Sequence, residues 1–126
     1  MSSEAEVKIK QDLLQEIQIL NENYRVLASF ISGADYDPAT IGNGMQTFKD
    51  SLSRASAYVL ALYNLKGRRV NIPWEPLFTS LDYAIATLST SATIKQRDAV
   101  RAILAMAQEQ MAQVISYFSA LKESLK

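Results

Sequence analysis

The sequence predicts an all-α protein, an up-down-up-down four-helix bundle with a short third helix. Three long stretches place apolar residues at alternating spacings of four and three, which keeps one face of a helix against a partner helix over many turns. These stretches run from Leu13 to Ile31, from Ile41 to Leu62 and from Val100 to Leu125. The links between the predicted helices span about four to eleven residues, which favours antiparallel neighbours.

The first helix is predicted over residues 3–32. Ser3 suits its N-cap because Glu6 follows three residues later, the spacing of a capping box, and Gly33 suits its end. The second helix is predicted over residues 38–65 and has two possible starts. Asp37 can cap a helix that begins at Pro38, or Asn43 can cap one with Gln46 in the capping-box position.

We favour the start at Pro38, because Ile41 already follows the apolar spacing of the second helix. Lys66 and Gly67 form a suitable C-terminus for this helix. Proline is tolerated only in the first turn of a helix, so Pro73 and Pro76 place the third helix at about residues 74–88. Thr93 followed by Gln96 makes a second capping box and opens the fourth helix, over residues 94–125. The whole chain, residues 1–126, is expected to be one domain.

The third helix is too short to line the bundle from end to end. At 1.5 Å per residue it spans about 24 Å, against about 43 Å for the first helix. The link around residues 89–92 is the favoured cover for the remainder. The alternative is an open apolar groove near Ile31, Ile41, Met45 and Phe48.

Composition excludes several classes of function. The chain has thirteen basic and thirteen acidic residues, no cysteine and no histidine. Disulfides, thiolate nucleophiles, imidazole catalysis and zinc sites built from nitrogen or sulfur are therefore excluded. No glutamate has the inward spacing that di-iron bundles use, and Asp35 with Asp37 provides too few oxygens for calcium. We expect no metal site, no cofactor, no catalytic residues and no small-molecule substrate.

Location follows from the lack of targeting features. No apolar run approaches the length needed to cross a bilayer, and the first residues lack the basic and apolar regions of a secretory signal. We expect a cytoplasmic (intracellular) protein that is not inserted in a membrane.

The second helix is apolar nearly all round between residues 55 and 65. Two neighbouring helices cannot bury apolar side chains on all sides of it, so a further contact is expected there. One explanation is that the connector at residues 66–72 folds back over it. The favoured explanation is an interface with a partner protein or a second copy of the chain, because aromatic side chains dominate the centres of interfaces. The predicted partner-binding residues are Tyr58, Leu60, Tyr63, Trp74, Phe78 and Tyr83. Met106, with Ile103 and Tyr117, is a candidate second apolar strip. The predicted function is thus a non-enzymatic interaction or assembly subunit.

Basic residues support a different function, that of a small helical subunit of a nucleoprotein complex. Two clusters could contact the phosphate backbone of a nucleic acid. They contain Lys66, Arg68, Arg69, Lys95, Arg97 and Arg101, with Lys49 and Arg54 in support. The simpler explanations are a solvated loop for the first cluster and neutralisation by Asp35 and Asp37 for the second. The Gly42-Asn43-Gly44 tripeptide lacks the context of a phosphate-binding loop, so we interpret its glycines as backbone freedom where a helix begins.

Overall fold

The structure is a computed structural model that describes residues 4–32, 38–68, 74–90 and 97–125, without the side chains of residues 30–32, 38, 39, 87–90, 97–101, 103 and 104. The described residues form four α-helices: α1 (Glu4–Ser32), α2 (Pro38–Leu65), α3 (Glu75–Thr90) and α4 (Arg97–Leu125). This confirms the predicted all-α bundle with a short third helix. Two helix ends lie inside described segments: α2 ends at Leu65, as expected, and α3 starts at Glu75, one residue after the expected start.

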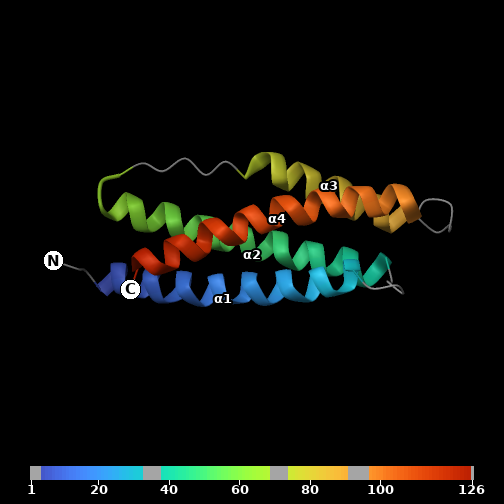
Figure 1. The fold of residues 1–126 in the computed structure, drawn as a ribbon. Coiled ribbons are helices and arrows are strands. Elements are labelled where there is room, and N and C mark those ends of the chain that lie inside the picture. Colours follow the sequence, from blue (N-terminus) through green and yellow to red (C-terminus); the bar gives the residue numbers. More distant parts are fainter. Residues whose placement is uncertain (1–3, 33–37, 69–73, 91–96, 126) are drawn as a thin grey trace.

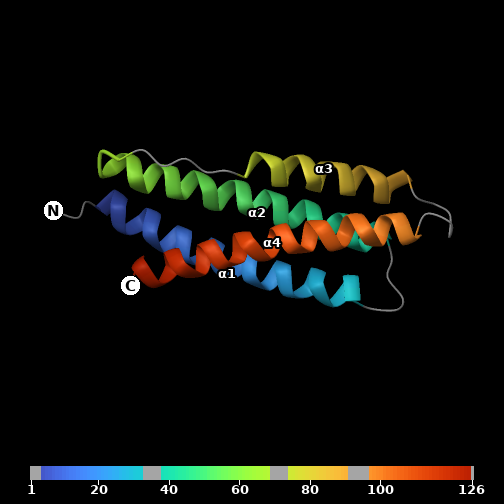
Figure 2. The same cartoon turned by 45° about the horizontal axis from the view of Figure 1, so that its top comes forward.

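Each helix packs against two neighbours. α1 lies beside α2 and α4, and α3 lies beside the same two helices on the opposite corner. Figures 1 and 2 show that α1, α2 and α4 run the length of the bundle, whereas α3 lines only the half that is remote from the first turn of α1 and the last turn of α4. The chain direction alternates from helix to helix, as expected for an up-down-up-down bundle.

The residues at four-three spacing form the core. Those of α2 from Ile41 to Leu62 are all buried, and their counterparts in α1 and α4 meet them along the bundle axis. Among the described side chains, α3 adds three buried hydrophobic residues to the core: Leu77, Leu81 and Ala84. The apolar periodicity therefore identifies the face that each helix buries, because residues at this spacing share one side of the helix.

Both ends of α2 have a clear local cause. The helix includes Pro38 and runs through Asn43, so Asn43 lies inside it and does not cap it. This agrees with the favoured start at Pro38. The last residue of α2 is Leu65, and Gly67, two residues later, has a φ of 70° and donates to the carbonyl of Asn64 at 3.0 Å. Arg68 donates to the carbonyl of Tyr63 at 2.9 Å. These two bonds form a Schellman motif, which needs a left-handed residue and so favours glycine. The candidate caps Ser3, Asp37 and Thr93 and the helix-ending Gly33 lie outside the described residues.

The interpretation of Gly44 as a flexible position at a helix entry is wrong. Gly44 lies inside α2, and among the described residues only Gly67 has a positive φ. A Cβ atom at Gly44 would lie 2.7 Å from Cδ2 of the buried Leu27. The glycine therefore lies where α1 and α2 approach closely, and a side chain there would require the buried Leu27 to shift.

The alternative of an open groove near Ile41, Met45 and Phe48 is also wrong, because all three side chains are completely buried. Ile31 belongs to the side chains outside the described set. The reason is the position of α3, which covers the half of the bundle that contains the start of α2. Its short length leaves unlined the opposite half, where α2 ends.

Candidate interaction site

The six predicted partner-binding residues do not form one surface. Leu60 and Tyr83 are exposed, whereas Tyr58, Tyr63, Trp74 and Phe78 are partly buried and pack against the core. Helical periodicity separates them further. Ser51 of α2 bonds to Glu16 of α1, and Tyr58 follows Ser51 by seven residues, so Tyr58 lies on the face of α2 toward α1. Lys49 of α2 pairs with Asp82 of α3, and Leu60 follows Lys49 by eleven residues, so Leu60 lies on the face toward α3.

An aromatic cluster lies where the beginning of α3 meets α4. Trp74 immediately precedes the helix, and its ring contacts that of Tyr117 edge to face, with centroids 5.2 Å apart and planes at 79°. Its centroid is 6.3 Å from that of Phe118, which is buried in the core. Edge-to-face contacts of this kind add about 0.5–1.5 kcal/mol to the burial of apolar area. Trp74 therefore anchors the beginning of α3 to α4.

Tyr117 is the described residue whose acidity responds most clearly to this packing. Burial raises the pKa of its phenol above the usual 10.0, and the nearby Tyr63 raises the pKa further by charge repulsion. Tyr63 belongs to α2 and Tyr117 to α4. Tyr117, an expected member of an exposed strip, is thus largely taken up by intramolecular contacts.

A groove of about 330 Å³ lies between α3 and α4. Its residues, called here the α3–α4 groove, are Thr79, Ser80, Tyr83, Met106 and Ala107. Tyr83 is 63% exposed and Met106 is 66% exposed, the highest values among the large hydrophobic residues described. The sequence pattern indicated Tyr83 and Met106 separately. It could not show that they face each other, because that depends on the register between two helices.

A smaller recess of about 100 Å³ lies farther along the same pair of helices. Its residues, called here the Trp74 recess, are Trp74, Pro76, Leu77, Gln110, Gln113 and Val114. Nε1 of Trp74 and Oε1 of Gln110 are buried and have no hydrogen-bond partner among the described residues. Buried polar atoms are normally paired, so two such atoms in one recess are an unusual concentration.

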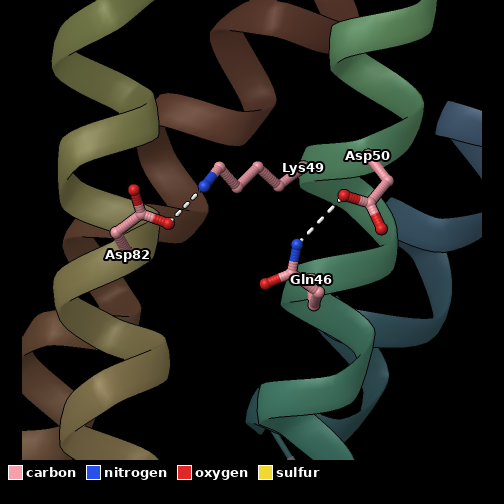
Figure 3. Close-up of polar contacts among 4 residues, drawn as sticks. All are labelled: Gln46, Lys49, Asp50 and Asp82. Carbon is pink, nitrogen blue, oxygen red and sulfur yellow. Dashed lines mark hydrogen bonds and ion pairs between the residues drawn. The ribbon is translucent and has the colours of Figure 1, made fainter.

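One ion pair fixes α3 against α2. Lys49 reaches from α2 to Asp82 on α3, and Figure 3 shows its ammonium group directed at the carboxylate. On the same face of α2, Gln46 donates to Asp50 at 3.0 Å within the helix. Lys49 was a supporting candidate for nucleic-acid contact, and in the structure it has a carboxylate partner within the chain.

A polar triad joins α1 and α2 and was missed by the sequence analysis; two of its members, Glu16 and Ser51, are buried, and the third, Arg54, has a side chain that is 51% exposed. Ser51 Oγ donates to Glu16 Oε1 at 2.8 Å, and Arg54 Nε donates to the same oxygen at 2.9 Å. Glu16 is 6% exposed and Ser51 is completely buried. The signal was present in the spacing, because Glu16 follows Leu13 by three residues and precedes Leu20 by four, which puts it on the buried face. Arg54, a supporting candidate for nucleic-acid contact, thus has a structural role.

The basic clusters are only partly described. Lys66 Nζ lies 3.7 Å from Glu6 Oε1 at the start of α1, a pairing between chain segments far apart in sequence. Arg68 is exposed just after the end of α2. Arg69 and Lys95 lie outside the described residues, and the side chains of Arg97 and Arg101 are outside the described set. Of the six basic candidates, the structure therefore describes the side chains of Lys66 and Arg68 alone, both just after the last residue of α2.

The described residues contain no group of three carboxylates that could hold a metal ion. None of the described helices combines the length and the apolar character that a bilayer-spanning segment requires. A comparison with known proteins finds no matching family model, no matching curated protein and no matching solved structure. The site must therefore be interpreted from its own geometry.

Proposed function

We propose that this protein is a non-enzymatic interaction or assembly subunit that buries an apolar aromatic surface against a partner protein or a second copy of itself. The observation that carries this proposal is the α3–α4 groove, where Tyr83 and Met106 combine the two largest exposures among the described large hydrophobic residues. Exposed apolar patches of this kind, bordered by polar residues, are typical of protein interaction sites. Aromatic residues and methionine are also enriched in interfaces.

The partner-binding surface proposed here differs from the six residues indicated by the sequence. Tyr83 remains at its centre, and Met106 of α4 joins it from the facing helix. Trp74 borders the surface from the adjacent recess. Tyr58, Tyr63 and Phe78 support the fold through contacts with the core. Leu60 is exposed on α2, outside the groove.

The proposal is tested with the double variant Tyr83→Ser/Met106→Ser. Val26→Ser on α1 is the matched control, because Val26 is 52% exposed and lies outside the groove. Self-association is measured by sedimentation velocity at high micromolar concentration, and partners are captured from the native cell. We expect an association that wild type and Val26→Ser share and that the double variant loses. A strict monomer that retains no protein through Tyr83 and Met106 overturns the proposal.

Contact with nucleic acid stays a prediction. Among its described candidates, Lys49, Arg54 and Lys66 have carboxylate partners within the chain, and Arg68 is exposed just after the end of α2. Binding through phosphates weakens steeply with salt. Filter binding at low ionic strength, with single- and double-stranded nucleic acids, is the direct measurement. Absence of binding there refutes the prediction for the isolated chain.

A further inference from the structure

α3 depends on its neighbours to remain helical. It has sixteen residues, five of which are serine or threonine, and these residue types favour a helix less than alanine or leucine does. A helix of this length is at best marginally stable in water when it is isolated. Packing of Leu77, Leu81 and Ala84 against the core therefore supports it. Detachment of α3 from the bundle would also break its backbone hydrogen bonds.

The seam between α3 and α4 is incompletely packed. The α3–α4 groove, about 330 Å³ in volume, lies along this seam. Protein interiors are normally close-packed, so the groove represents contacts that the two helices do not make with each other. The Trp74 recess lies on the same seam and contains the buried, unpaired Nε1 of Trp74 and Oε1 of Gln110. Such atoms lower the stability of the closed seam, and this penalty disappears when water reaches them.

The contact of α3 with α2 includes an ion pair that is accessible to solvent. Lys49 pairs with Asp82, whose side chain is 57% exposed (Figure 3). Exposed ion pairs contribute little to stability. α1 and α2 are joined differently, by the bond from Ser51 to Glu16 in a buried site and by the close approach of the helices at Gly44. The described contacts thus hold α1 to α2 more firmly than they hold α3 to its neighbours.

We propose that α3 opens as one cooperative unit while α1, α2 and α4 stay packed, so that α3 is a movable cover over one face of α2 and α4. That face is apolar and completely buried when α3 is in place. Leu52 follows Lys49 by three residues and so lies on the side of α2 toward α3, and Ala107 and Val114 of α4 line the seam. Local opening of this kind has a lower free energy than global unfolding. The inference does not depend on the proposed function, because it concerns the isolated chain.

The experiment is amide hydrogen exchange of the full-length chain, followed by NMR at several urea concentrations below the unfolding transition. Residues 79–86 report on α3, residues 13–20 on α1 and residues 48–55 on α2. After correction for intrinsic rates, the α3 amides are expected to exchange at least about tenfold faster than those of α1 and α2. They should also share one dependence on urea, smaller than that of global unfolding, because the opening exposes less surface.

Two variants distinguish local opening from global unfolding. Ser51→Ala weakens a contact between α1 and α2 that survives the opening of α3. It should accelerate exchange in α1 and α2 about tenfold and leave exchange in α3 unchanged. Asp82→Asn weakens a contact that is lost in both processes, so it should accelerate exchange in all three segments by the same factor, up to about five.

Two results overturn the proposal. In the first, α3 exchanges with the same free energy as α1 and α2 and is accelerated by Ser51→Ala to the same extent, which means that the bundle opens only as a whole. In the second, each α3 amide has its own dependence on urea, which indicates fraying from the helix ends rather than one opening. The comparison is made between segments of one folded chain, and wild type alone distinguishes these cases if a variant fails to fold.

Discussion

Ser51→Ala tests how α1 and α2 hold their register. The hydroxyl of Ser51 donates to the carboxylate of Glu16 at 2.8 Å in a site with no access to solvent. Hydrogen bonds to charged groups contribute about 1.5–3 kcal/mol. Arg54 still donates to the same oxygen in the variant, so the lower part of this range applies. We expect the free energy of unfolding to fall by about 1.5 kcal/mol.

The matched control is Ser53→Ala, because Ser53 is exposed on the same helix two residues away. A surface substitution of this kind changes stability by less than about 0.5 kcal/mol. Both variants are unfolded in urea and followed by far-ultraviolet circular dichroism, with the dependence on urea checked to be unchanged. Equal stabilities of Ser51→Ala and Ser53→Ala at neutral pH would refute the assignment of a buried hydrogen bond to Ser51.

Replacement of the whole triad separates packing from electrostatics. Glu16→Leu/Ser51→Ala/Arg54→Met removes the carboxylate together with both donors and leaves no polar group unpaired. Replacing a buried ionic cluster by apolar residues is often neutral or stabilising, whereas removing one partner is costly. The triple variant is therefore expected to be at least as stable as Ser51→Ala alone. A triple variant less stable than Ser51→Ala contradicts this reasoning.

Three further outcomes follow from local geometry. Gly67→Ala is expected to lower the free energy of unfolding by about 1 kcal/mol in the same urea assay, because alanine rarely adopts the positive φ of this position. A steric clash does not contribute, since no atom lies within 4 Å of the added Cβ. An unchanged urea midpoint contradicts the Schellman assignment. Asp82→Asn should cost less than about 1 kcal/mol, and the cost should shrink in high salt; Asp50→Asn is its control. Because the folded pKa of Tyr117 is raised, wild type should lose more stability than Tyr117→Phe as pH rises above about 10; equal losses refute this.

Helix positions could be predicted from the sequence because they depend on local patterns. The spacing of Leu13, Ile17 and Leu20 identifies a buried face without knowledge of the partner helix, and Gly67 signals a helix end by its own conformational freedom. Pro38 likewise marks a first turn. Such features need only the chain within a few residues, which explains why the end of α2 at Leu65 and the start of α3 at Glu75 lie within one residue of the expected positions.

Contacts between helices could not be predicted in the same way. Glu16 has the spacing of a buried residue, but its charge favours an exposed position until Ser51 and Arg54 are known to face it. The encounter of Tyr83 with Met106 requires the register of α3 against α4. The position of α3 along the bundle is also a property of packing, and it decides which half of α2 is covered.

Because α3 is short, it contributes little to the core, and the fluorescence of Trp74 can report on its attachment to the bundle. α3 supplies only three of the nineteen buried hydrophobic side chains of the described residues, so its departure exposes far less apolar area than global unfolding does. Trp74, the chain's single tryptophan, lies at the junction that such an opening would break. Its indole emission is therefore expected to follow the detachment of α3 from α4, and also the arrival of any molecule along the α3–α4 seam, because its ring contacts Tyr117 and Phe118 of α4.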